Sequence, residues 1–478
     1  MFSSGSSEHL PAVLESTELQ TRKENKDLAD VKRVHTVQSL IDEEVKTVSY
    51  VDIKLETPDY KTAKSELMNQ LVRQIDFVAL DQLDEELQRK KVLDVCDKIL
   101  AEIPSPLNGS QIEALKRQTL DEIFGFGPLE PLLADPEISD IMMNTHKQVY
   151  IEKHGKLFQT DVTFLDEQHL LTIIQRIVSR VGRRIDEASP MVDARMPDGS
   201  RFNAIIPPLA LDGCLVSIRK FKKNKMPLSA YVQYGSMSDQ MHEFLKICTH
   251  VGLNMIVSGG TGSGKTTLLN ALSGGIGHGE RIITIEDAAE LQLQQPHVLR
   301  LETRPASMEG RGEVTQRQLV KNALRMRPDR IILGEIRGEE VVDVLSAMNT
   351  GHDGSMATIH ANNPRDCMAR IENLVGMSEL RLSSQALRSQ IASALQMIIQ
   401  IERMRDGARR IVAIEEIVGV EGDIITTQTL FSYKATGQDR DGKLIGEFIC
   451  HGIRPKMLNR AEYFGLAQAT LECFTVGV

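Results

Sequence analysis

The sequence predicts an α/β protein with a mainly parallel sheet domain in its C-terminal half. A smaller α+β domain and an N-terminal helical segment with a disordered leader precede it. After residue 228, apolar strand-like runs alternate with helical patterns, which is typical of a parallel sheet covered by helices. Between residues 138 and 219 the apolar runs are short, and Lys153-His154-Gly155-Lys156 separates two of them as a hairpin turn would. The length of 478 residues also exceeds what one ordinary core supports.

We expect four segments along the chain: a disordered leader over residues 1–60, a helical segment over 61–123, an α+β domain over 124–227, and the parallel-sheet domain with a C-terminal β-rich and helical extension over 228–478. The leader is polar and charged without sustained periodicity, apart from a transient helix near residues 39–46. Two interpretations of the leader stay open, a docking arm and a solvated extension.

The helical segment follows from apolar residues that recur at helical spacing. The pattern predicts a helix over residues 59–105, which Pro104 and Pro106 end, and a second helix over 110–123. A tight connector follows at residues 124–129. In the α+β domain we expect strands at 138–143, 149–151, 158–164, 202–206 and 214–219, and an amphipathic helix over 167–181.

The C-terminal domain begins with a helical lead-in over residues 228–251. We expect its strands at 254–257, 281–285, 298–301, 330–333 and 356–359. Later β-rich runs at 396–401, 410–417 and 424–431 predict an antiparallel extension, and a helix follows near 455–464.

One glycine-rich stretch lies between an expected strand and an expected helix. Residues 259–266 read G-x-x-x-x-G-K-T, which is the phosphate-loop pattern in its required context. A loop around a triphosphate needs torsions that side chains forbid, and bare N–H groups at a helix N-terminus. The predicted cradle consists of Gly259, Gly260, Thr261, Gly262, Ser263, Gly264, Lys265, Thr266 and Thr267. Lys265 would reach the β- and γ-phosphates, and the Thr266 hydroxyl would bind Mg²⁺.

Two further strands of this domain end in acidic residues. Ligands of open α/β sheets lie at the carboxyl ends of strands, so Glu286 would face the phosphates and orient an attacking water. The alternative is a helix N-cap by Asp287, and both roles can hold at once. The run at residues 330–337 resembles a Walker B element with Gly334 at the usual aspartate position. Glu335 is then the acid that acts there; holding Mg²⁺ through water and polarising the nucleophile both stay open. His360 ends the next strand, where a γ-phosphate sensor would lie, although a lone histidine is usually structural.

Arginines of the α+β domain are candidates for reaching the nucleotide from outside the phosphate loop. Arg195 and Arg201 flank a Pro-Asp-Gly-Ser turn, and Arg219 ends a strand. An arginine that approaches the γ-phosphate stabilises the charge of the transition state. The alternative is ordinary surface charge.

Composition narrows the function classes. The net charge of −10, the pI of about 5.7 and the absence of tryptophan disfavour a dedicated nucleic-acid binder. Six scattered cysteines without a C-x-x-C pair suggest neither zinc nor a redox pair, and they fit reduced thiols in a cytoplasmic protein. With no apolar run of membrane-spanning length and no secretory signal, we expect membrane contact through partners only.

The order of the motifs resembles one family. After the phosphate loop come T-I-E-D-A-A-E-L, R-P-D-R-I-I-L-G-E-I-R-G and G-H-D-G-S-M-A-T-I-H-A-N-N, which resemble the Asp, Walker B and His boxes of the type II/type IV secretion ATPase superfamily. The G-E ending is that family's own form of Walker B. F-G-F-G-P-L-E-P-L-L and D-E-A-S-P-M-V-D-A-R-M-P-D-G-S-R-F-N further resemble the CpaF branch, which powers tight-adherence (Flp) pilus assembly. The resemblance covers about residues 93–465.

This resemblance implies a homohexamer whose subunits each carry an N-terminal domain and a RecA-like P-loop domain, with ATP between them and against a neighbour. It implies Mg-ATP hydrolysis and domain motions that are passed to inner-membrane platform proteins. By position, Glu286 matches the catalytic glutamate and His360 the His-box residue, while Arg201 and Arg219 match arginines that approach the phosphates and Arg195 is a weaker match. The four-cysteine zinc module of some relatives is lacking, so no zinc is expected.

Two other functions stay as alternatives. A DNA-translocating or helicase-type RecA-like motor predicts basic or aromatic pore loops, which the acidic balance disfavours. A GTPase switch predicts an N-K-x-D motif after the phosphate loop, and the sequence has none.

Overall fold

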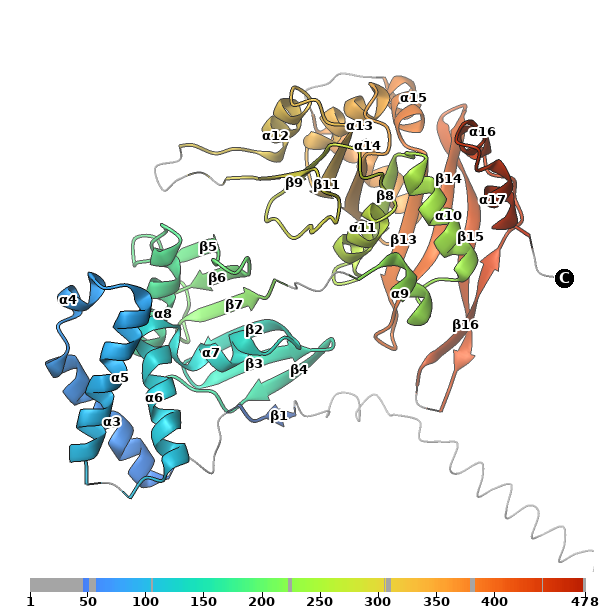
Figure 1. Ribbon diagram of the computed structural model, residues 1–478. Coiled ribbons are helices and arrows are strands. Elements are labelled where there is room, and N and C mark those ends of the chain that lie inside the picture. The colour runs from blue at the N-terminus through green and yellow to red at the C-terminus, as the bar shows by residue number, and fades with distance from the viewer. Residues whose placement is uncertain are drawn as a thin grey trace, which may run out of the picture.

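The computed structural model describes residues 46–50, 57–104, 106–221, 226–304, 306, 311–378, 383–440 and 442–475. The predicted disordered leader and its transient helix lie outside these residues, except for 46–50 and 57–60. Figure 1 shows a group of helices (blue) beside a first sheet (teal to green), and a second, larger sheet with its own helices. The described elements follow the predicted order of a helical segment, an α+β part and a RecA-like α/β part. Within the described residues, no helix is both long and apolar enough to span a bilayer.

The helical segment consists of α3 (Pro58–Gln74), α4 (Phe77–Asp81), α5 (Glu85–Glu102) and α6 (Gly109–Phe124). The single helix predicted over residues 59–105 is therefore wrong. Asp76 and Asp84 interrupt it, because their carboxylates accept hydrogen bonds from the first amides of α4 and α5 and so start new helices. The helix predicted over 110–123 is confirmed as α6. The core of the helical segment includes Tyr60, Leu67, Leu71, Val92, Cys96, Ile99 and Leu115.

The first sheet has seven strands in the order β1-β4-β3-β2-β7-β6-β5. Their bounds are β1 (Thr47–Val48), β2 (Ile138–Thr145), β3 (Gln148–Lys153), β4 (Lys156–Thr160), β5 (Met191–Arg195), β6 (Arg201–Ile205) and β7 (Leu215–Arg219). The predicted hairpin is confirmed between β3 and β4, where His154 and Gly155 have positive φ. The predicted helix over 167–181 is α8 (Glu167–Arg180), whose apolar side packs into the core of this sheet.

Four elements of this part were not predicted. β5 carries polar and charged residues on its exposed face, which weakens its sequence pattern. The glycine-proline connector contains the short helices η1 (Gly127–Leu129) and α7 (Glu130–Ala134), since proline is tolerated in a first helical turn. β1 lies within the predicted leader and pairs in parallel with β4. Tyr50, just after β1, donates its hydroxyl to Asp135 at 2.7 Å and its amide to Asp161 at 2.7 Å.

The second sheet has nine strands in the order β10-β9-β11-β12-β8-β13-β14-β15-β16. The five predicted strands are confirmed as β8 (Met255–Gly259), β9 (Ile282–Glu286), β10 (Val298–Glu302), β11 (Arg330–Ile336) and β12 (Met356–His360), and all their pairings with each other are parallel. Helices on both faces are α9 (Leu228–Gln233), α10 (Asp239–His250), α11 (Lys265–Ser273), α12 (Gln316–Ala323), α13 (Glu340–Asn349), α14 (Pro364–Gly376) and α15 (Ser384–Ala394).

The C-terminal part of this sheet differs from the prediction in one strand. β13 (Met397–Arg403) pairs in parallel with β8, so it completes the parallel sheet rather than beginning the antiparallel extension. The extension consists of β14 (Arg409–Glu421), β15 (Ile424–Gln438) and β16 (Leu444–Cys450). Of these three strands, β16 was not predicted. The predicted terminal helix is α16 (Leu458–Tyr463), followed by α17 (Ala467–Glu472).

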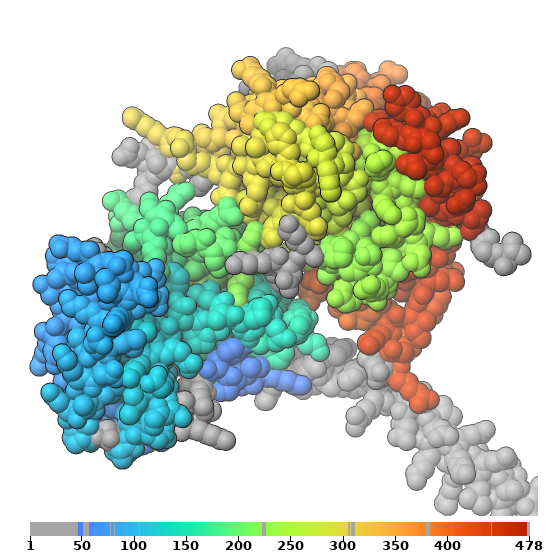
Figure 2. All heavy atoms as spheres, viewed as in Figure 1, coloured from blue at the N-terminus to red at the C-terminus, as the bar shows by residue number. Residues whose placement is uncertain are grey.

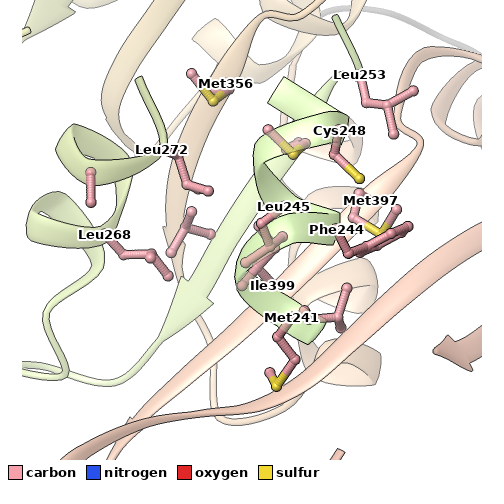
Figure 3. Close-up of a cluster of buried hydrophobic side chains, with 14 of the residues drawn as sticks. Met241, Phe244, Leu245, Cys248, Leu253, Leu268, Leu272, Met356, Met397 and Ile399 are labelled. Atoms are coloured by element: carbon pink, nitrogen blue, oxygen red, sulfur yellow. The ribbon is translucent and has the colours of Figure 1, made fainter. Parts of the chain in front are cut away.

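Two hydrophobic cores hold the second sheet, one on each face. In Figure 3, Met241, Phe244, Leu245 and Cys248 of α10 gather near Met397 and Ile399 of β13, with Leu268 and Leu272 of α11 alongside. All eight side chains are fully buried. This packing fixes α11 against β8 and β13, and thereby the position of the loop between β8 and α11.

The two sheets contact each other through arginines. Arg195 of β5 donates to Glu302 of β10 at 2.7 Å, and Arg403 of β13 donates to the Gly155 carbonyl in the β3–β4 turn at 2.8 Å. Figure 2 shows the helical segment (blue) packed beside the first sheet on the side away from the second. The carboxyl end of β10 therefore contacts the first sheet directly.

Candidate nucleotide site

The predicted phosphate loop, residues 259–267, joins β8 to α11. Gly262 and Gly264 have φ of +68° and +96°, which side chains disfavour. A Cβ at Gly259 would collide with the Ile401 carbonyl and would lie 2.6 Å from Ser263 Oγ. The glycine spacing is therefore required by the close approach of neighbouring backbone.

The start of α11 fits an anion. Its N-cap is Gly264, and no side chain caps the helix, so the first amides are available to a phosphate. Lys265 Nζ donates to the Gly260 carbonyl at 3.0 Å, and burial lowers the pKa of this amine although Glu335 opposes that effect. Thr266 lies in the same turn and is half-buried, whereas Thr261 and Thr267 are exposed. A half-buried ammonium beside free helix amides suits the phosphates of ATP, and the Thr266 hydroxyl suits Mg²⁺.

Glu286 ends β9 and is 3% exposed. Its Oε2 accepts hydrogen bonds from the amides of Glu290 at 2.7 Å and Leu291 at 2.9 Å, while Oε1 is buried without a protein partner. Burial raises the pKa of this carboxyl to about 7, and the two amide hydrogen bonds only partly offset that effect. A fixed carboxyl with one uncommitted oxygen and a pKa near neutrality suits proton transfer to or from water.

The structure explains why glycine, rather than the usual aspartate, occupies position 334. A Cβ at this position of β11 would lie 2.8 Å from Glu286 Cγ, so the neighbouring strand leaves space for the Glu286 side chain. The glycine at the usual Walker B aspartate position therefore seats Glu286.

We expect Gly334→Ala to destabilise the fold by about 1–3 kcal/mol and to lower ATP turnover, because Glu286 cannot move without losing its two amide hydrogen bonds. Chemical denaturation and a phosphate-release assay measure the two effects. Gly376→Ala is the matched control, since a Cβ there meets nothing within 4 Å. Wild-type stability and turnover in Gly334→Ala would contradict this interpretation.

Glu335 lies beside Lys265 and is paired with an arginine that the sequence reasoning did not single out. Arg337 contacts Glu335 Oε2 at 2.6 Å and Asp287 Oδ2 at 2.9 Å. It thereby joins the ends of β9 and β11, and its charge acts on Lys265. The structure thus brings together Lys265, Glu335, Arg337 and Asp287.

His360 ends β12, and the register of the sheet places it opposite Gly259 of the phosphate loop. It lines a hollow with Ala361, Asn362, Asp366, Ala369, Arg370 and Asn373. Because His360 lies opposite Gly259, this hollow adjoins the phosphate loop, and the charge of Arg370 lowers the pKa of Lys265.

The three candidate arginines form one row across neighbouring strands. Arg195 lies opposite Arg201, and Arg201 lies opposite Arg219. This arginine row is on the exposed face of the first sheet. Arg195 contacts Glu302 and the Ala289 carbonyl, whereas Arg201 pairs with Asp193 at 2.7 Å and Arg219 with Asp140 at 3.2 Å. The hydrogen bonds to Asp193 raise the pKa of Arg201.

The arginine row faces the acidic segment, residues 286–302, rather than the phosphate loop. Arg195, the weaker match in the sequence, contacts Glu302 of this segment directly. Arg201 interacts with Asp287 and Glu290 only through their charges. Among the described residues, Arg219 contacts its own sheet through Asp140 and Arg201, so this structure does not bring Arg219 to the phosphate loop.

Two further arginines near the phosphate loop were missed. Arg409 Nε donates to the Gly262 carbonyl at 3.0 Å, and Arg403 lies 3.8 Å from where a Gly262 Cβ would be. Both belong to the β13–β14 hairpin, almost 140 residues after the loop. No local motif marks them, and only the parallel pairing of β13 with β8 brings them there.

A glycine-rich phosphate loop, strand-end carboxylates and a parallel sheet define this protein as a P-loop ATPase. Residues 122–441 match the model of the family described as Type II/IV secretion system protein. The chain is 39% identical over 324 residues to a Mycobacterium tuberculosis protein assigned to conjugal transfer, which covers 66% of this chain and 92% of that relative. It is 32% identical over 315 residues to the type IV secretion system protein PtlH of Bordetella pertussis, with 60% and 92% covered.

Among solved structures, the chain is similar to the VirB11 ATPase of the Brucella suis type IV secretion system, at 27% identity, 63% and 96% coverage and a TM-score of 0.33. The family match extends over well more than half of the chain. The chain therefore belongs to the type II/IV secretion family, as its motifs predicted, and it is an ATP hydrolase of that family.

Proposed function

We propose that this protein is the hexameric motor of a tight-adherence (Flp) pilus machine of the CpaF type, which couples Mg-ATP hydrolysis to domain motion at the bacterial inner membrane. The proposed working parts are an N-terminal leader (residues 1–60), a helical segment (61–123), an α+β domain (124–227) and the RecA-like domain (228–478). In this proposal the protein is cytoplasmic, reaches the membrane through inner-membrane platform proteins and does not act on nucleic acid.

One observation carries the proposal: the arginine row of one domain faces the acidic segment of the other, and Arg195 bridges them. A phosphate bound next to this segment would offer Arg201 and Arg219 stronger partners than Asp193 and Asp140, because phosphate carries more charge. The two domains would then close around the nucleotide, and loss of the γ-phosphate would release them. The difference between the nucleotide states before and after loss of the γ-phosphate is thereby converted into domain motion.

Within the RecA-like domain, the amides of residues 262–267 and Lys265 would hold the β- and γ-phosphates. Binding requires Lys265 to leave the Gly260 carbonyl for the phosphates. Mg²⁺ would be held by Thr266 and, through water, by Glu335, and when bound it supplies charge neutralisation between the phosphates. Arg337 would then keep Asp287 as its partner when Glu335 turns to this role.

Glu286 would orient the attacking water through its uncommitted oxygen and accept its proton. His360, opposite Gly259, would sense the γ-phosphate from the adjoining strand. The same arginine row would serve the nucleotide of the neighbouring subunit if copies assemble side by side, which gives the hexamer a functional reason.

The direct test combines hydrolysis with assembly. Purified full-length protein should hydrolyse ATP in preference to GTP, should not be stimulated by DNA, and should form hexamers by mass photometry when a non-hydrolysable ATP analogue is present. A protein that stays monomeric with every nucleotide would contradict the motor proposal, and DNA-stimulated turnover would instead favour a DNA translocase.

We expect Arg201→Ala to lower turnover by about tenfold while the hexamer still forms, because two arginines of the row remain. Steady-state hydrolysis and mass photometry measure both. Arg184→Ala is the control, since Arg184 lies in the same domain and, among the described residues, forms an exposed ion pair with Asp186 at 3.4 Å. Unchanged turnover in Arg201→Ala would count against the assigned role.

A further inference from the structure

The turn that connects β13 to β14 contacts three separate parts of the molecule. We name residues 403–410 the coupling turn. On one side Arg403 donates to the Gly155 carbonyl of the first sheet at 2.8 Å. On the other side Arg409 donates to the Gly262 carbonyl of the phosphate loop at 3.0 Å.

Asp406 lies at the centre of the coupling turn, and its side chain is only 3% exposed. Its carboxylate accepts from the Ala408 amide at 3.0 Å, from Arg410 Nη1 at 3.0 Å and from the Leu444 amide at 2.9 Å. The bond to Ala408 is the ordinary local bond of a turn aspartate. The bond to Leu444 is different, because it reaches the first residue of β16, 38 residues further along the chain.

The third contact partner is therefore the long β15–β16 hairpin, seen at the lower right of the second sheet in Figure 1. Arg410 lies 5.3 Å from the centre of the Tyr433 ring, and Tyr433 packs so closely on Gly446 that a Cβ there would lie 2.5 Å from its ring. Asp406 and Arg410 thus hold the turn end of this hairpin. Burial alone would raise the pKa of Asp406, but the hydrogen bonds from Leu444, Ala408 and Arg410 outweigh burial and lower it.

We propose that Asp406 is a positioning residue for ATP binding: it fixes the coupling turn so that Arg409 holds the Gly262 peptide of the phosphate loop, and it links that loop to the β15–β16 hairpin. A peptide whose carbonyl is held on one side has its following N–H fixed on the other, since the peptide unit is planar and trans. Fixing the 262–263 peptide prepares the loop for phosphate and lowers the ordering cost of binding. The inference rests on the ATPase activity of this site, and neither the hexamer nor the pilus enters it.

Asp406→Asn is the test, because asparagine keeps the shape and one acceptor oxygen but loses the charge that Arg410 and the Leu444 amide share. We expect the KM for ATP to rise about fivefold while kcat changes less than twofold. The neutral asparagine holds Arg410 and the Leu444 amide more weakly, so part of the free energy that orders the phosphate loop is lost. Asp84→Asn is the matched control: Asp84 also accepts a backbone amide hydrogen bond, from Leu87 at 2.9 Å, but lies in the helical segment, away from the coupling turn and the β15–β16 hairpin.

A second readout separates positioning from a structural role. In the wild type, hydrogen exchange of the peptide that contains Leu444 should slow when a non-hydrolysable ATP analogue binds, and in Asp406→Asn it should not. Arg409→Lys, an exposed change that removes the Nε donor, should reproduce the rise in KM without loss of stability.

Each other outcome has a defined meaning. If wild-type protein hydrolyses ATP but Asp406→Asn has a wild-type KM, the inference is overturned. It is also overturned if kcat and stability fall together at unchanged KM, which is the signature of a structural aspartate. If wild-type protein does not hydrolyse ATP at all, the activity itself fails rather than this inference.

Discussion

Glu286→Gln is expected to lower the rate of ATP hydrolysis by about a thousandfold while ATP still binds, because the change removes a general base without altering its shape. The amides of Glu290 and Leu291 can donate to the glutamine oxygen as they do to Oε2. Single-turnover phosphate release measures the chemical step, and binding of a fluorescent ATP analogue measures affinity. Wild-type turnover in this variant would refute the assignment.

The pH dependence of the wild type gives an independent check. Because kcat/KM reports the free enzyme, it should rise with pH and level off above an apparent pKa of about 7, the value to which burial raises Glu286. The ascending limb should be lost in Glu286→Gln. Glu313→Gln, an exposed carboxylate of the same domain, should keep the wild-type profile.

The free energy of unfolding should also depend on the ionisation of Glu286, and it should fall as pH rises. The ordinary pKa of glutamate is 4.5 and that of Glu286 is raised to about 7, so the folded protein holds this proton more tightly than the unfolded chain. The contribution to the free energy of unfolding is complete below pH 4.5 and is lost as pH rises through 7. Glu286→Gln should therefore gain stability relative to the wild type above pH 7, as measured by urea denaturation.

Lys265→Ala is expected to weaken ATP binding by at least about a hundredfold and to abolish measurable turnover. The reason is the loss of a half-buried ammonium that would donate to two phosphates, each charged hydrogen bond being worth about 1.5–3 kcal/mol. The fold should remain, because Lys265 Nζ donates to the Gly260 carbonyl of its own loop and alanine is a good helix former at the start of α11.

Isothermal titration with ATP and a thermal melt distinguish lost binding from lost folding. Lys246→Ala is the matched control, since Lys246 is exposed on α10 and makes only a surface pair with Glu243 at 3.4 Å. Binding of ATP by Lys265→Ala with wild-type affinity would contradict the placement of the phosphates at this loop.

The sequence placed the phosphate loop, Glu286, Glu335 and His360 at strand ends of one sheet, and the structure brings these strand ends to one edge. This was possible because each signal is local: a buried strand has a continuous apolar run, and the turn after it needs specific residue types. Local signals failed at residues 59–105, where a helical pattern continues across Asp76 and Asp84, although both cap new helices.

By itself, the sequence determined the α/β class, the phosphate loop and the order of the acidic strand ends, since these depend on neighbours within about ten residues. The tertiary structure alone decided that Gly334 makes room for Glu286, that Arg337 bridges two strand ends, and that Arg403 and Arg409 reach the phosphate loop. The physical reason is strand order: β13 lies next to β8 although almost 140 residues separate them, and pairing at such distance follows from the packing of the whole sheet.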